Sequence, residues 1–170
     1  HYPIVGDAKT VIEQIDSLIP SDFKPDKIER ENWLDQINQW ENEHPTVAVQ
    51  KGKKIKTSYA VDTISKITGG RDVIVTDVGQ HQMWVAQYYR FKSPRNQITS
   101  GGLGTMGFGF PAAIGAKLGR PNERVLAICG DGSFQMNMQE FSTAVANDLD
   151  LKIILIKNGH HGMVRQWQTL

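Results

Sequence analysis

Cysteine is nearly absent from this chain of 170 residues: Cys129 is its one thiol, so an internal disulfide is excluded. The lack of disulfides fits a reducing compartment. Neither sign of charge prevails, because the net charge is +1 with 22% charged residues, and no basic stripe suggests a nucleic acid. No apolar run approaches the roughly 20 residues that span a bilayer. We therefore expect partners that are neither nucleic acids nor membranes.

The length is sufficient for one α/β domain with a core, preceded by a short leader. The chain begins without methionine and stops inside a helical pattern, so we interpret it as a piece of a longer protein. Residues 1–7 are predicted to end an upstream domain, with its last strand at 2–6. Residues 8–56 are predicted to form linker helices and a basic loop. The main domain is then 57–170, truncated at its C-terminus.

Two amphipathic helices are predicted in the leader, because apolar residues recur at helical spacing over 8–19 and 28–40. Asp7 can cap the first helix, and the prolines between positions 20 and 25 separate the two. Nothing in either helix suggests chemistry, so we interpret both as packing elements.

The segment 125–156 has the pattern of a strand, a helix and a second strand. Apolar runs at 125–129 and 151–156 predict two buried strands. Between them, apolar residues at helical spacing predict one continuous helix; they are Phe134, Met138, Phe141, Ala144 and Val145. Such a unit joins parallel strands through a right-handed crossover. The fold class predicted is therefore α/β, a parallel sheet flanked by helices.

Polar residues follow both of these strands, at positions that parallel pairing brings to one edge. Asp131 lies in Gly130-Asp131-Gly132 after the first strand, and Asn158 follows the second. One carboxylate with neutral oxygens is how proteins usually hold Mg²⁺ beside phosphate groups, and a helix N-terminus favours anions. The pattern predicts a magnesium–diphosphate site. The alternative is that the glycines form only a tight turn and Asn158 is an ordinary loop residue.

Two further segments end at the same predicted edge. The strand 72–76 leads to Gly79, Gln80 and His81, where Gln80 and His81 can donate hydrogen bonds to phosphate oxygens. The strand 97–99 opens into a glycine-rich run over 101–109 that contains Met106. The spacing of its glycines does not fit a dinucleotide fingerprint. The run indicates a backbone pressed against a bulky group, or close packing of a helix on a strand.

Residues 159–168 are predicted to form a loop entering a helix. His160 and His161 are adjacent, but without cysteines or a third spaced ligand a transition-metal site is disfavoured. Met163 and Trp167 lie four residues apart on one helical face. That face is either core or the wall of a substrate channel.

Together these motifs resemble one family. Gly130-Asp131-Gly132 followed by Asn158 is similar to the magnesium and cofactor motif of thiamine diphosphate enzymes. Within that superfamily, the segments 77–84, 100–107, 130–136 and 162–168 resemble the catalytic subunit of acetohydroxyacid synthase, also called acetolactate synthase. The resemblance covers essentially the whole chain. It implies that 57–170 is the thiamine diphosphate-binding domain, following the end of the middle domain.

The resemblance also implies roles for individual residues. Mg²⁺ would be held by Asp131, Asn158 and the backbone carbonyl of His160. Met106 would support the bent cofactor, and Gly104 would accept a hydrogen bond from its amino group. The full set of implied cofactor-binding residues is Gly79, Gln80, His81, Gly104, Thr105, Met106, Gly130, Asp131, Gly132, Ser133, Asn158, His160, Gly162 and Met163. The implied substrate channel is lined by Met163, Val164 and Trp167.

The activity implied is decarboxylation of pyruvate and transfer of the two-carbon unit to a second 2-oxo acid, in branched-chain amino acid biosynthesis. The family's activating glutamate comes from the N-terminal domain of a partner subunit, and its FAD lies mostly on the middle domain. We therefore expect no catalytic residue here and an inactive isolated chain. A homodimer or homotetramer with a shared active site is implied, and a regulatory small subunit is a further possible partner. Another enzyme acting on 2-oxo acids (a pyruvate oxidase or a decarboxylase) and a non-catalytic diphosphate-binding module are the alternatives.

Two positions depart from the family pattern. Lys157 stands where the family has asparagine, and we expect it to point away from the metal because neighbouring strand residues face opposite ways. His161 stands where the family has an apolar residue, which leaves the packing of that loop open. The absence of a transit peptide favours a bacterial cytoplasm, with an organelle as the alternative.

Overall fold

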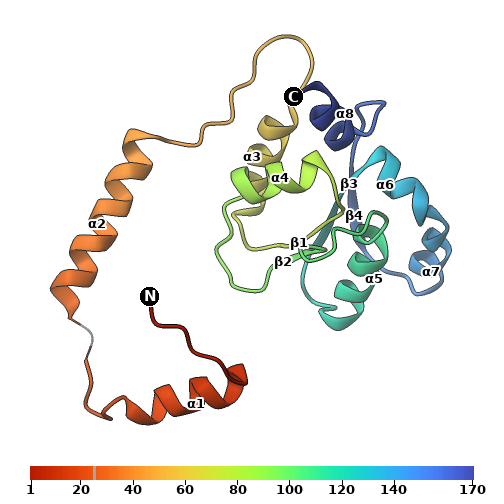
Figure 1. The fold of residues 1–170 in the computed structure, drawn as a ribbon. Helices are drawn as coiled ribbons and strands as arrows, with labels where there is room; N and C mark the ends of the chain where they lie inside the picture. The colour runs from red at the N-terminus through yellow and green to blue at the C-terminus, as the bar shows by residue number, and fades with distance from the viewer. Residues whose placement is uncertain (25) are drawn as a thin grey trace. The chain divides into compact units, whose positions relative to one another are not determined.

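The computed structural model describes residues 1–24 and 26–170. The contacts between residues divide the chain into two units, His1–Pro45 and Thr46–Leu170. Figure 1 colours the chain from red at the N-terminus to blue at the C-terminus. Pro25, within the predicted break at 20–25, lies outside the described residues. In the ranges described, no helix is both long and apolar enough to cross a membrane.

The first unit contains the two predicted helices, α1 (Ala8–Leu18) and α2 (Lys27–Glu43). Asp7 caps α1 by accepting a hydrogen bond from the Thr10 backbone at 3.0 Å, as predicted. Asp26 caps α2 in the same way. Neither helix has a buried residue among those described. The strand predicted at 2–6 was wrong: this segment is irregular, because a strand needs a neighbour for its backbone hydrogen bonds.

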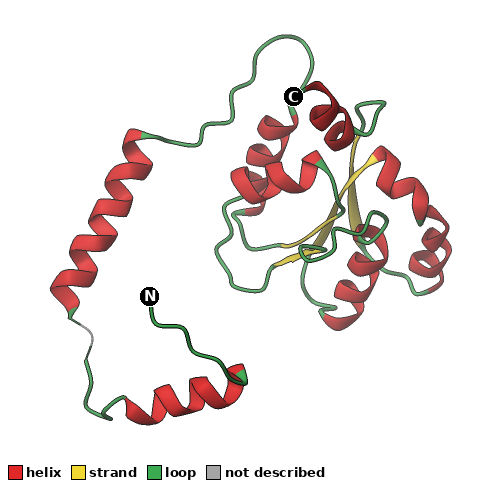
Figure 2. Ribbon diagram, in the orientation of Figure 1, coloured by secondary structure: helices red, strands yellow, loops and turns green. Residues whose placement is uncertain are grey.

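The second unit is a parallel sheet with helices on both faces, as predicted (Figure 2). In the described part of the chain the strand order is β2-β1-β3-β4, and every neighbouring pair is parallel. The elements are α3 (Thr57–Thr68), β1 (Val73–Thr76), α4 (Gln80–Tyr88), β2 (Gln97–Thr99), α5 (Gly109–Gly119), β3 (Val125–Gly130), α6 (Asp131–Met136), the 3₁₀ helix η1 (Met138–Glu140), α7 (Phe141–Ala146), β4 (Leu151–Ile156) and α8 (Gly162–Thr169).

The core lies on both faces of the two inner strands. Along β1, Ile74 packs with Val61 of α3 and Val85 of α4, whereas Val73 and Val75 pack with Ala113 of α5. Successive strand residues point to opposite faces, so a strand covered on both sides is apolar throughout. This is why β1 and β3 are continuous apolar runs and why the sheet's loops, rather than its faces, are left to bind ligands.

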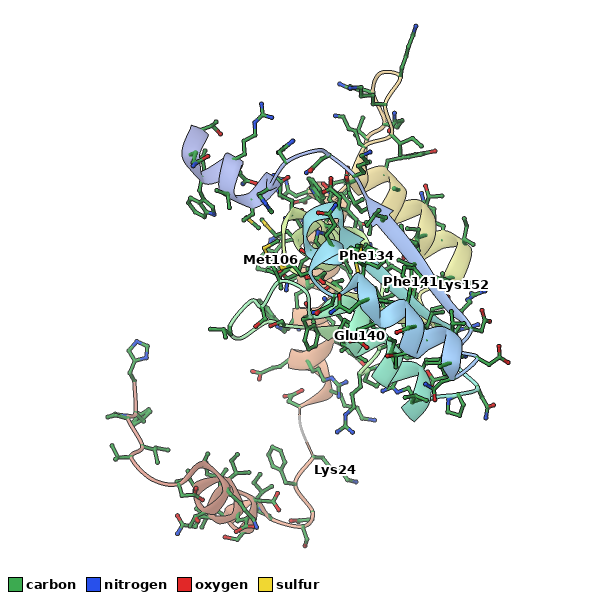
Figure 3. All side chains as sticks on the ribbon, turned by 90° about the vertical axis from the view of Figure 1, so that its right-hand side faces the viewer. Lys24, Met106, Phe134, Glu140, Phe141 and Lys152 are labelled. Carbon is green, nitrogen blue, oxygen red and sulfur yellow. The ribbon has the colours of Figure 1, made fainter. Side chains whose placement is uncertain are left out.

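The predicted continuous helix over 134–145 was wrong. The structure divides it into α6, η1 and α7, and Met138 and Val145 are exposed. The break comes at Asn137, which leaves helical geometry (φ −136°, ψ 25°) and donates its side-chain amide to the Gly107 carbonyl at 2.7 Å. Asparagine side chains compete with helical hydrogen bonds in this manner. Phe134 and Phe141 still form an aromatic cluster, with ring centroids 5.6 Å apart (Figure 3).

The second strand of the predicted unit is less buried than expected. None of the residues of β4 is fully buried, and Leu155 is 46% exposed. The cause is its place at the edge of the described sheet, where it pairs with β3 alone. A run of apolar residues therefore identified the strand correctly but not its position.

Candidate functional site

A cleft of about 70 Å³, partly open to solvent, lies where β1, β3 and β4 end. Most of the residues proposed for cofactor and metal binding line it: Gly79, Gln80, His81, Met106, Gly130, Asp131, Gly132, Ser133, Asn158, His160, Gly162 and Met163, with Val164 of the proposed channel. Segments far apart in sequence are thus brought together by the parallel register. The convergence fits the rule that open α/β sheets bind ligands at the carboxyl ends of their strands.

Asp131 and the loop after β4 are in contact. Gly130 is paired with Ile156 across the β3–β4 register, and the Gly159 backbone donates to Asp131 Oδ2 at 3.2 Å. Asn158 Oδ1 accepts from the His160 backbone at 3.1 Å, a turn that holds Asn158 and His160 beside each other. The loop that carries the Asn158 amide oxygen and the His160 carbonyl oxygen therefore contacts the Asp131 carboxylate through Gly159. Carboxylate, amide and carbonyl oxygens are the kinds of ligand that Mg²⁺ takes.

A transition-metal site is not supported by the geometry. Across residues 1–24 and 26–170, no group of three or more His, Cys, Asp or Glu side chains could hold a metal ion. The His160 ring is used within its own loop, where Nδ1 lies 2.9 Å from the Asn158 carbonyl oxygen.

His81 lines the cleft and has a buried ring nitrogen without a hydrogen-bond partner. It is only 5% exposed, and its Nε2 has no hydrogen-bond partner. Burial lowers the pKa of His81 below 6.5, and the nearby Asp77 carboxylate and a backbone hydrogen bond to Asp77 oppose this shift. Buried polar atoms are rarely left without a partner. A ligand that hydrogen-bonds to this nitrogen fits the site.

The glycines around His81 allow its ring to lie close to the backbone. A Cβ at Gly79 or at Gly130 would come within 3.2 Å of the His81 ring carbon Cε1. Gly79 also has φ +144°, which favours glycine. A larger residue at either position would press against the His81 ring, which explains why both positions are glycine.

Gln80 and Ser133 are already engaged in hydrogen bonds. Gln80 Nε2 donates to Gln166 Oε1 of α8 at 2.8 Å, and its side chain fills the space where a Cβ at Gly162 would lie, 2.1 Å from Oε1. Ser133 Oγ donates to the Val78 carbonyl at 3.0 Å. Gln80 Nε2 retains a second N–H that can donate to a ligand. Ser133 has one hydroxyl hydrogen, so a ligand that accepts from it would have to replace the Val78 carbonyl.

The remaining proposed residues lie outside the cleft lining. In the ranges the structure describes, Gly104, Thr105 and Trp167 are not among the residues that surround it. Gly104 and Thr105 are exposed in the glycine-rich loop, and Trp167 is 70% exposed on α8. Their roles remain predictions. Lys157 is also exposed and outside the lining; the direction of its side chain stays a prediction.

Several lining residues were missed by the sequence analysis: Val78, Trp84, Ile156 and His161. His161 packs directly on the α6 turn, since a Cβ at Gly132 would lie 2.9 Å from the ring carbon Cε1. Asp77 was passed over as well, although a carboxylate directly after a buried strand and before the glycine-containing turn was a usable indication. Its side chain is fully buried.

Comparison with known proteins gives the class first. The model of the thiamine pyrophosphate enzyme, C-terminal TPP binding domain, matches residues 77–170, which is more than half of the chain. The chain therefore belongs to the thiamine pyrophosphate enzymes and contains this C-terminal domain. A solved structure agrees in fold: a Rhodococcus jostii RHA1 thiamine diphosphate-dependent 4-hydroxybenzoylformate decarboxylase matches with a TM-score of 0.65 at 22% identity, over 72% of this chain and 23% of that one.

Within the class, the similar curated proteins are acetolactate synthases. The chain is 47% identical to the large subunit of Buchnera aphidicola subsp. Schlechtendalia chinensis, over all of this chain and 30% of the relative. Identity is 44% to acetolactate synthase 1, chloroplastic, of Nicotiana tabacum, over 99% of this chain and 25% of the relative. The identity is 43% to the acetolactate synthase isozyme 3 large subunit of Escherichia coli, over 99% of this chain and 29% of the relative. The chain thus spans between a quarter and a third of the length of these relatives.

Proposed function

We propose that this chain is the magnesium- and diphosphate-binding part of an acetolactate synthase catalytic subunit. The activity proposed is decarboxylation of pyruvate and transfer of the two-carbon unit to pyruvate or 2-oxobutyrate, giving the precursors of valine, leucine and isoleucine. The observation that carries the proposal is the meeting of Asp131 with the 158–160 loop beside the unpaired nitrogen of His81. Relatives 43–47% identical that are named acetolactate synthases support the choice of activity.

In this proposal, different residues of the cleft bind different parts of the cofactor. Asp131, Asn158 and the His160 carbonyl hold Mg²⁺ with oxygen ligands. The diphosphate is held by Gly79, Gln80, His81, Gly130, Gly132 and Ser133. Gly104, Thr105, Met106, Gly162 and Met163 lie along the rest of the cofactor, and Met163, Val164 and Trp167 line substrate access. The bound cofactor supplies the carbanion chemistry, and the protein supplies its position and electrostatic surroundings.

The proposal extends to partners that supply what these residues do not. The catalytic glutamate would come from an N-terminal domain of a neighbouring subunit, so we propose a homodimer or homotetramer with shared active sites. FAD would be bound mostly by a middle domain, and a regulatory small subunit is a further partner. The location proposed is a bacterial cytoplasm or an organelle, since the relatives come from bacteria and chloroplasts.

The test is a calorimetric titration of thiamine diphosphate with Mg²⁺ into the longest available form of the protein. We expect magnesium-dependent binding that Asp131→Ala weakens by at least about a hundredfold, because a metal site loses its one carboxylate. The matched control is Asp72→Ala, which removes a carboxylate from the opposite end of β1. The absence of binding by the folded wild-type protein would contradict the proposed function.

Analysis of the products from pyruvate then separates the proposed activity from its alternatives. We expect acetolactate from the full-length protein. Acetyl phosphate or acetaldehyde as the main product would identify an oxidase or a decarboxylase instead. Binding of a nucleotide without binding of thiamine diphosphate would identify a non-catalytic module.

A further inference from the structure

Asp77 is a buried carboxylate for which the sequence pattern gives no role. It follows β1 directly and is 0% exposed. Burying a charge is costly unless hydrogen bonds replace the lost water. Here three backbone N–H groups replace the water. Asp77 Oδ1 accepts from Val78 at 2.7 Å and from Gly107 at 2.9 Å, and Oδ2 accepts from Gly109 at 2.9 Å.

These three hydrogen bonds join two walls of the cleft. Val78 begins the segment that carries Gln80 and His81, which line the cleft. Gly107 directly follows Met106, the one residue of the glycine-rich loop that lines it (Figure 3). The two segments are 30 residues apart in sequence at Asp77 and Gly107. The Asp77 side chain therefore joins them at the Met106 end of the loop, whereas Gln82 of α4 donates to Thr99 and to the Ser100 carbonyl at the start of the loop.

The loop side of this junction permits little adjustment. A Cβ at Gly109 would come within 2.7 Å of the Asp77 backbone nitrogen, so the two backbones are in direct contact. Gly107 has φ +87°, and its carbonyl accepts from Asn137 Nδ2 at 2.7 Å. The peptide preceding Gly107 is thus held by Asp77 through its N–H, and the following peptide is held by Asn137 through its carbonyl.

We propose that Asp77 is a positioning residue, whose carboxylate sets the place of Met106 relative to Gln80 and His81 across the cofactor cleft. The proposal rests on the proposed function, because it assigns Asp77 a part in holding the cofactor in its productive geometry. Asp77 itself contacts no part of the ligand in this assignment. It acts through the backbone of Val78, Gly107 and Gly109.

The test compares Asp77→Asn with Asp72→Asn in the full-length protein. Asparagine keeps the size of aspartate but has a single acceptor oxygen, so at least one of the three N–H groups faces an NH₂ group. Asp72 lies at the other end of β1 and is paired with Arg124, so the same substitution there serves as the matched control for lost stability. Two quantities decide the test: kcat at saturating cofactor and hydrogen exchange of the loop amides. The Kd for thiamine diphosphate with Mg²⁺ is measured to set the saturating concentration for each variant.

We expect Asp77→Asn to speed exchange of the Gly107 and Gly109 amides and to lower kcat, each by about ten- to a hundredfold, the range expected for losing a hydrogen bond to a charged group. Asp72→Asn should leave both quantities within about twofold. Equal effects of the two variants, or unchanged kcat in Asp77→Asn, would overturn the proposal. Absence of cofactor binding by the wild-type protein would instead overturn the proposed function.

A measurement on the wild-type protein keeps the proposal testable if the Asp77 variant does not fold. The Gly107 and Gly109 amides should be protected from exchange, although they lie at the end of a loop, whereas the amide of Gly102 in the same loop is exposed. Exchange of Gly107 and Gly109 as fast as that of Gly102 would show that the carboxylate does not hold the loop, and the proposal would fail.

Discussion

The two ends of the parallel sheet satisfy their buried polar groups in different ways. At the amino end, Asp72 precedes β1 and forms an ion pair with Arg124, which precedes β3. Asn96, which precedes β2, donates to the Arg71 carbonyl at 2.6 Å and accepts from Arg120 at 3.0 Å. The polar side chains at this end thus find their partners within the protein, in side chains and in one backbone carbonyl.

At the carboxyl end the corresponding groups are held by the backbone and leave space between them. Asp77 accepts from three backbone N–H groups, and His81 Nε2 has no partner. Both ends of β1 carry a buried aspartate, so the residue type does not distinguish a structural position from a functional one. The partners distinguish them: the carboxylate of Asp77 is bound by backbone amides, and a ring nitrogen of the nearby His81 has no partner, which indicates a site built for a ligand.

The largest effect should come from adding a methyl group at the carboxyl end. Gly109→Ala would place Cβ within 2.9 Å of the Asp77 backbone, and we expect a loss of about 3 kcal/mol or more of stability, because the backbone cannot yield easily. Gly115→Ala in the same helix, α5, meets nothing within 4 Å and should stabilise by up to about 1 kcal/mol. Chemical denaturation measures both. If both variants changed the free energy of unfolding in the same direction, the close contact at Asp77 would be contradicted.

Removing the ion pair at the amino end should be the next largest effect. Asp72→Ala leaves Arg124 without its carboxylate partner, and we expect a loss of about 1–3 kcal/mol of stability. The Kd for thiamine diphosphate with Mg²⁺ should stay within about twofold of wild type, since Asp72 is remote from the cleft. A large change in that Kd, measured by calorimetry on the folded variant, would show that the two ends are coupled.

A smaller effect is expected where α8 meets the cleft. Gln166→Ala removes the acceptor for Gln80 Nε2, and we expect a loss of about 1 kcal/mol or less, typical of one neutral hydrogen bond. Hydrogen exchange in α8 should become faster by the factor that corresponds to this free energy, while exchange in α4 should not change. Unchanged exchange in α8 would mean that its other contacts alone fix it to the domain.

The smallest effect concerns pH. Because burial lowers the pKa of His81 below 6.5, the unfolded chain takes up this proton first as the pH falls. The neutral ring's contribution to stability is therefore complete above pH 6.5 and is lost as the pH falls towards the lower pKa of the folded state. Denaturation at several pH values should show that His81→Gln lacks this dependence. The same slope in both proteins would assign it to other groups.

Local patterns in the sequence predicted most of the elements, because caps, periodicity and apolar runs act within a few residues of one another. The Asp7 cap and the strand at 125–129 are of this kind. The meeting of Asp131 with the loop after β4 could also be predicted, since it follows from parallel pairing.

What could not be predicted depends on tertiary contacts. Asn137 ends a helix because a carbonyl from the glycine-rich loop lies within reach. β4 is only half-buried because of its place in the strand order. Trp84 and His161 line the cleft through the way α4 and the last loop pack. These contacts cannot be predicted from a local sequence pattern, and neither can the three hydrogen-bond partners of Asp77.

The place of Cys129 gives the molecule an internal reporter. It is the one thiol of the chain, lies fully buried on an inner strand directly before Gly130, and burial raises its pKa to about 12. A thiol reagent can therefore label it only when β3 separates from its neighbours, so the labelling rate measures the opening of the sheet. A ligand bound at Asp131, two residues further on, should slow that labelling in proportion to its affinity. The kinetics of one chemical modification would then report on the cofactor site without any measurement of catalysis.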